Sequence, residues 1–131
     1  MKILITIFVF LILSLEGVRP VLAEEQVNCY VKFSNTLEVG ACFNEQLEKY
    51  DADLNTTYQS IMVKLRKKGT WGSLQNAQRE WITFRDKNCM FHSDLNFGGS
   101  AAGPAYVECK ARMTQERLDE LSDVLEDLER H

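Results

Sequence analysis

The apolar positions between residues 35 and 69 predict a long α-helix. Its stripe recurs at steps of seven, four and three residues and consists of Leu47, Leu54, Tyr58, Ile61 and Leu65. Side chains at this spacing share one face of a helix. Asn35 is a favourable N-cap, and Glu38 three residues later completes a capping-box pattern. Gly69 and Gly72 interrupt the pattern, so we expect the helix to end there.

Two more amphipathic segments follow. Ser73 can cap a second helix, whose apolar stripe continues to about Phe91 and includes Leu74, Ala77, Trp81 and Phe84. Glycine-rich sequence over residues 92–103 predicts a loop, and Pro104 suits the first position of a third helix. The stripe of this third helix consists of Val107, Ala111, Thr114, Leu118, Leu121, Leu125 and Leu128. Opposite lies an acidic row that we interpret as a solvated face: Glu116, Asp119, Glu120, Asp123, Glu126 and Asp127.

Strand signals are weak, and the only short candidate runs from Gln26 to Phe33. There is no internal repeat and no low-complexity segment. The sequence therefore predicts an all-α fold, a small bundle of about three main helices with a short additional piece at its N-terminal end.

The first 23 residues predict a cleaved signal peptide. Lys2 supplies a positive charge, residues 3–15 are almost entirely apolar, and a small-residue pattern at Ala23 suits cleavage. A membrane anchor is the alternative, but the apolar run is shorter than the roughly 20 residues that span a bilayer. We therefore expect residues 24–131 to form a single periplasmic or secreted domain, with no membrane association after cleavage.

Charge narrows the range of partners. The chain has 15 basic and 19 acidic residues, a formal net charge of −4. The leader contains two basic residues and one acidic residue, so its loss takes the net charge to −5. This balance argues against nucleic acid, whose recognition needs basic patches, and is compatible with a basic protein partner.

The four cysteines, Cys29, Cys42, Cys89 and Cys109, all lie in the expected domain. An even number in an exported chain predicts two disulfides, for which three pairings are possible. The motif Cys89-x-x-His92 raises zinc as an alternative. Structural zinc sites usually show two closely spaced ligand pairs and this chain shows one, so we expect no metal.

Polar residues occupy several stripe positions, and they are Asp51, Asn55 and Tyr58 on the first helix, Gln78, Trp81 and Arg85 on the second, and Thr114 and Arg117 on the third. A lone buried charge costs several kcal/mol, so it needs a partner. We therefore expect Asp51 and Arg85 to meet, with Asn55 and Gln78 completing a hydrogen-bonded network. A structural role is favoured over catalysis, because structural ion pairs are common.

The sequence offers little support for an enzyme. It contains neither Gly-x-Ser-x-Gly nor His-Glu-x-x-His, and its two histidines are His92 and His131. Cysteines held in disulfides provide no thiolate nucleophile. We expect no catalytic residues and no cofactor.

The same polar and cysteine positions carry a family resemblance. The motifs, in order, are Thr36-x-Glu38-x-x-x-Cys42, Asp51-x-x-Leu54-Asn55-x-x-Tyr58, Ala77-Gln78-Arg79-x-Trp81-Ile82-x-Phe84-Arg85-Asp86-x-x-Cys89, Gly98-Gly99-Ser100, Tyr106-x-x-Cys109 and Thr114-x-x-Arg117-x-x-x-Leu121. Over nearly the whole expected domain they resemble the N-terminal domain of LprI-type lysozyme inhibitors. The resemblance implies a helical, secreted or periplasmic protein of the bacterial envelope, and inhibition of lysozyme.

The expected helix positions favour one disulfide pairing. Cys89 ends the second helix and Cys109 opens the third, so the connecting loop brings them together. Cys29–Cys42 would then join the N-terminal segment to the first helix. Each bond closes a loop of roughly 14 to 21 residues, worth about 3 kcal/mol in the chain-entropy model. Crossed pairings would gain somewhat more entropy but require other helix positions.

A lysozyme inhibitor must fill the cleft that holds two catalytic carboxylates. The loop from His92 to Ser100 is the candidate, because a Cys89–Cys109 bond would tether both its ends and lower the ordering cost of binding. Its candidate contact residues are His92, Ser93, Asp94, Asn96 and Ser100. An ordinary surface connection is the alternative for this loop. The second functional hypothesis is a non-enzymatic envelope module that binds another protein, a toxin or a wall component, and the leucine face of the third helix would also suit a dimer contact.

Overall fold

The computed structural model describes residues 27–96 and 98–131. They form four helices, which are α1 (Cys29–Lys32), α2 (Thr36–Lys68), α3 (Trp71–Asp94) and α4 (Ala102–Arg130). This part of the chain contains no strand, so the all-α prediction is confirmed, with α1 as the short additional piece. The predicted signal peptide, residues 1–23, lies outside the described residues.

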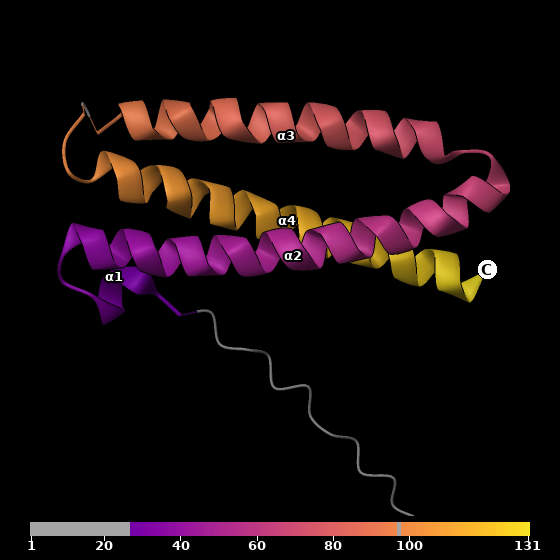
Figure 1. Cartoon of the computed structure of the whole chain (residues 1–131), viewed down its shortest axis with the longest axis horizontal. Helices are drawn as coiled ribbons and strands as arrows, with labels where there is room; N and C mark the ends of the chain where they lie inside the picture. The colour runs from indigo at the N-terminus through magenta and orange to yellow at the C-terminus, as the bar shows by residue number, and fades with distance from the viewer. Residues whose placement is uncertain (1–26, 97) are drawn as a thin grey trace, which may run out of the picture.

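The central helix of the bundle is α4 (Figure 1). It runs parallel to α2 and antiparallel to α3, and it packs against both. By contrast, α2 and α3 make few direct contacts with each other. The α3–α4 connection, the beginning of α2 and α1 gather at the left end of the molecule in Figure 1. In the described residues, no helix is both long enough and apolar enough to span a bilayer.

The segment from Gln26 to Phe33 was expected as a strand candidate, and its described part forms α1 instead. Asn28 caps this helix, because its side-chain oxygen accepts a hydrogen bond of 3.1 Å from the Tyr30 N–H. Cys29 is fully buried against α2. The segment therefore lies on a helix surface, where no strand is available to pair with its backbone, and the local cap decides its structure.

The limits of α2 follow the signals in the sequence. The Asn35 side chain accepts a 2.9 Å hydrogen bond from the Glu38 N–H, as expected for a capping box. Gly69 ends the helix with a φ of 74°, the left-handed conformation that glycine adopts at little cost.

The start of α3 was predicted at Ser73 but lies at Trp71. The Thr70 N–H donates to the Leu65 carbonyl at 3.2 Å, so the chain reverses within two residues and resumes helical geometry at once. Ser73 therefore lies inside the helix and does not cap it, and no side-chain hydrogen bond caps α3.

The connection between α3 and α4 is shorter than predicted. Helix α3 continues through Asp94, and α4 begins at Ala102, so the loop is residues 95–101. Pro104 is the third residue of α4, where we expected the first. This position tolerates proline, because the first four N–H groups of a helix have no acceptor within it.

The apolar core is divided along the bundle. One cluster contains Leu54, Ile61 and Leu121, with leucines of α4 packed against it. A second lies around the Cys29–Cys42 bond and a third around Cys89–Cys109. On α2 and α4, the polar residues Asp51 and Thr114 fall between these clusters in the sequence, so the middle of the bundle contains polar contacts.

The stripe predicted for α3 is only partly buried. Leu74 and Trp81 pack against the Leu54 cluster, but Ala77 is exposed, and Phe84 and Phe91 are each 58% exposed. The buried residues of α3 are Gln78, Arg85 and Cys89. Helix α3 packs mainly on α4, and Phe84 is turned about 100° around the helix from Arg85, which points inward.

Candidate functional site

Both predicted disulfides are present. Cys29–Cys42 joins α1 to α2, and Cys89–Cys109 joins the last turns of α3 to the first turns of α4. Because Cys89 is bonded to Cys109, it is not available as a metal ligand beside His92. In the described ranges, no group of three or more His, Cys, Asp or Glu side chains is placed to hold a metal ion.

A buried arginine connects the three long helices. Arg85 on α3 is 7% exposed, and its Nη1 donates to Asp51 Oδ1 on α2 at 3.0 Å and to Thr114 Oγ1 on α4 at 2.9 Å. Its Nε donates to Asp86 Oδ1 at 3.0 Å. The structure therefore brings Asp51 and Arg85 together. The side chains of Asp51 and Asp86 are 43% and 44% exposed, so water reaches both carboxylates while the guanidinium stays buried.

Trp81 links Arg85 to a second arginine. The guanidinium carbons of Arg85 and Arg117 lie 5.2 and 5.9 Å from the centre of the Trp81 ring, within the range of a cation–π contact. The Arg117 Nε donates to Gln78 Oε1 at 3.0 Å. Gln78 is therefore joined to the network through Arg117 and Trp81.

Two of the residues expected in this network lie elsewhere. Asn55 is exposed, so it does not complete the buried part of the network. Tyr58 is partly buried and packs against the Leu54 cluster. We use the name polar cluster for Asp51, Gln78, Trp81, Arg85, Thr114 and Arg117. No buried side-chain polar atom of the described residues lacks a hydrogen-bond partner, which is the condition for a polar cluster to fix helix packing.

The predicted contact residues are divided between the last turn of α3, with His92, Ser93 and Asp94, and the loop, with Asn96 and Ser100. The Ser93 Oγ donates to the Ala102 carbonyl at 2.9 Å, and the Asn96 side chain donates to the His92 carbonyl at 3.2 Å. The first bond joins the last turn of α3 to the first residue of α4, and the second turns Asn96 back onto the end of α3. His92, Asp94 and Ser100 remain exposed.

An apolar groove adjoins this loop. Its volume is about 580 Å³, and it lies between the first turns of α2 and α4, with Ser100 at its margin. Leu37, which also lines it, is 83% exposed. Exposed apolar surface that forms a groove is typical of protein-binding sites.

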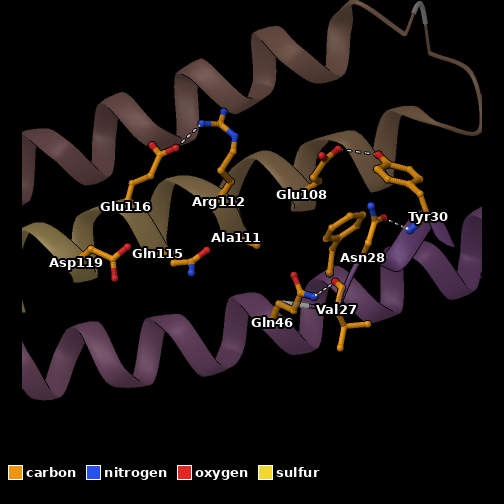
Figure 2. A pocket seen from close by; sticks show the side chains of 11 residues that line it. Val27, Asn28, Tyr30, Gln46, Glu108, Ala111, Arg112, Gln115, Glu116 and Asp119 are labelled. Atoms are coloured by element: carbon orange, nitrogen blue, oxygen red, sulfur yellow. Dashed lines mark hydrogen bonds and ion pairs between the residues drawn. The ribbon is translucent and has the colours of Figure 1, made fainter. Parts of the chain in front are cut away.

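A second concave surface lies between α1, α2 and α4, and we name it the α1–α4 groove (Figure 2). Its volume is about 500 Å³, and it is lined by Val27, Asn28, Tyr30, Phe43, Gln46, Glu108, Ala111, Arg112, Gln115, Glu116 and Asp119. Three carboxylates and one guanidinium give this lining a formal net charge of −2. Figure 2 shows Ala111, Gln115 and Asp119 following one another along α4, on the side that faces α2.

The N-terminal wall of this groove is fixed by direct contacts. The Tyr30 hydroxyl donates to Glu108 Oε2 at 2.6 Å (Figure 2). The Tyr30 ring meets the Phe43 ring edge-on, with centroids 5.2 Å apart. The Gln46 side chain donates to the Val27 carbonyl at 2.7 Å. Burial of the Tyr30 phenol, followed by its hydrogen bond to Glu108 and the charge of that carboxylate, raises the pKa of Tyr30 from 10.0 to about 12.

The α1–α4 groove is not among the sites predicted from the sequence. The pattern predicts a solvated face at Glu116 and Asp119 and a strand candidate at Tyr30. A signal was available, since Glu108, Arg112, Gln115 and Asp119 are spaced at four, three and four residues and so share one side of a helix. Nothing in the local sequence indicates that α1 folds back beside α4.

Comparisons with known proteins give one informative match. A family model described as lysozyme inhibitor LprI matches residues 29–121. An uncharacterised protein of Rhizobium meliloti (strain 1021) is 26% identical over 110 residues, covering 75% of this chain and 79% of that protein. No solved structure matches this chain.

Proposed function

This chain belongs to the LprI family of lysozyme inhibitors, and on that premise we propose that it is an exported protein that binds a lysozyme and blocks its cleft. The match over residues 29–121 carries the proposal, because it spans all the described helices except the end of α4.

The compartment follows from the disulfides. Both cystines are of the kind that persists outside the reducing cytosol, which supports the periplasm or the extracellular space. Lysozyme acts on the cell wall, so an inhibitor in that compartment meets its target.

The charge supports a lysozyme as partner. Many lysozymes are basic, whereas this chain has a formal net charge of −4. Opposite charges raise the association rate, most strongly at low ionic strength. The carboxylates on the exposed side of α4 supply much of this negative charge.

The contact that we propose is the end of the molecule that carries the α3–α4 loop. The Cys89–Cys109 bond and the Ser93–Ala102 hydrogen bond hold the two ends of the loop together, and the Asn96 side chain donates back to the His92 carbonyl. A loop whose ends are fixed loses less entropy on binding, so it suits insertion into a cleft. The exposed His92, Asp94 and Ser100 are the side chains that would reach the enzyme.

A lysis assay tests this function. The full chain is expressed in a host that exports it, and the disulfide-bonded protein is purified. It is then added at micromolar concentration to cell-wall suspensions that are being lysed by lysozymes of different structural types. We expect slower lysis with at least one lysozyme, and no effect on a wall amidase used as the control enzyme. If no lysozyme is slowed, the proposal is wrong. If lysozyme and amidase are slowed equally, the protein covers the wall, and the envelope-module hypothesis is favoured.

A further inference from the structure

We propose that the α1–α4 groove binds an arginine side chain presented by a basic protein partner. This inference deepens the proposed function, since it names a second contact surface for the lysozyme, and it rests on that function only for the identity of the partner. The loop would enter the cleft, and the groove would hold a guanidinium on the enzyme surface beside it.

The negative charge of the groove comes from side chains of α4. Glu108, Glu116 and Asp119 line it, and Arg112 is the one cation in the lining. Arg112 already pairs with Glu116 at 2.8 Å, on the same helix. A carboxylate accepts up to about four hydrogen bonds, so Glu108 and Glu116 keep acceptor capacity beside their contacts with Tyr30 and Arg112. The groove therefore retains negative charge for an incoming cation.

The walls suit a planar cation. Tyr30 is 53% exposed, and its ring forms part of the lining beside the carboxylate of Glu108. A guanidinium can stack on an aromatic face while it donates two parallel hydrogen bonds to a carboxylate. Lysine offers a point charge and cannot make this planar contact, so the chemistry favours arginine.

The wall is organised before any partner arrives. A disulfide, the Tyr30–Glu108 hydrogen bond and the Gln46–Val27 hydrogen bond hold the N-terminal segment in place. A preformed site avoids the cost of ordering the segment on binding. The groove has a volume of about 500 Å³, and its lining includes the half-exposed Tyr30, so a side chain from another protein can reach it.

The first test compares two substitutions on α4. Glu108 lines the groove beside Tyr30, and Glu126, at an exposed position of the same helix, does not line it. Glu108→Gln and Glu126→Gln change the net charge equally, and a glutamine at position 108 keeps an oxygen that can accept from the Tyr30 hydroxyl. We expect Glu108→Gln to raise the Kd for lysozyme about fivefold in calorimetry at low salt, and Glu126→Gln to raise it less than about twofold. Equal losses would mean that only net charge matters and would overturn the inference.

The second test does not need a lysozyme. The exported protein is titrated with N-acetyl-arginine-N-methylamide, and with the neutral glutamine analogue as control, while backbone amide shifts are recorded by NMR. We expect shifts at Tyr30, Glu108 and Arg112 with the arginine compound alone, and weaker binding in Glu108→Gln. This result without lysozyme binding would end the proposed function but keep the groove as a site for another basic protein. Shifts spread evenly over the acidic face, or equal shifts with glutamine, would contradict the inference.

Discussion

The polar cluster and the α1–α4 groove are built from the same kinds of side chain, yet they differ in what surrounds them. In the cluster, Arg85 is 7% exposed and its donors reach acceptors on α2, α3 and α4. In the groove, Asp119 and Glu116 stand on the exposed side of α4 and face an open space. Both regions combine arginine, carboxylates and an aromatic ring.

This difference separates structure from binding. A buried guanidinium whose hydrogen bonds are satisfied within the protein has no capacity left for a partner, and it specifies how the helices pack. Exposed carboxylates beside a preformed wall remain free to exchange water for a ligand. Residue type alone would assign both regions the same role. The solvent exposure of the charged groups and the number of hydrogen bonds they make within the protein distinguish a structural region from a binding site.

Removal of either disulfide should cause the largest loss of stability, and it should affect the groove only when the bond to α1 is removed. Cys29→Ala/Cys42→Ala and Cys89→Ala/Cys109→Ala open loops of sequence separation 13 and 20. Each should lower the free energy of unfolding by about 3 kcal/mol in urea denaturation. Only the first should abolish binding of the arginine compound, because α1 has four residues and no helix of that length is stable alone. Retention of that binding in the first variant would show that the groove does not depend on α1.

Arg85→Met should break the polar cluster and leave the groove intact. The variant loses hydrogen bonds to Asp51, Thr114 and Asp86, but two of these partners are half exposed and can be hydrated. We therefore expect a loss of about 2 kcal/mol, less than for a fully buried pair, measured by thermal and urea denaturation. Arg79→Met, at an exposed position of the same helix, is the control and should change stability little. Unchanged helicity and melting temperature in Arg85→Met would refute the structural role of the cluster.

Tyr30→Phe, a substitution in the wall of the groove, should cause the smallest loss of stability. Because the folded-state pKa of Tyr30 is raised from 10.0 to about 12, the folded protein holds the phenolic proton more tightly than the unfolded chain. The resulting stabilisation is complete below pH 10 and is lost as the pH rises towards 12. Ultraviolet absorbance titration should show one tyrosine ionising near pH 12, absent in Tyr30→Phe and retained in the control Tyr106→Phe. The loss of stability at pH 7 should be about 0.5 kcal/mol. Four tyrosines with ordinary titration would contradict the described contact with Glu108.

The sequence was informative where the structure depends on near neighbours. The cap at Asn35, the end of α2 at Gly69 and the apolar stripe of α4 are set by residues within a few positions of one another. It was less informative for α3, where the inward face carries Gln78 and Arg85 in place of phenylalanines. Their burial depends on acceptors from α2 and α4, which a single helix pattern does not contain.

The sequence by itself determined the all-α class and the number of main helices, because helical periodicity and helix ends are local properties. It favoured one of three disulfide pairings, and the structure contains that pairing. The pairing of Asp51 with Arg85 also followed, since a charge in an apolar stripe needs an opposite charge. Only the tertiary structure decided that the segment after Val27 folds as α1 beside α4 and so creates an acidic groove. That arrangement joins Tyr30 to Glu108, 78 positions apart, and contacts between such distant residues arise only when whole helices pack.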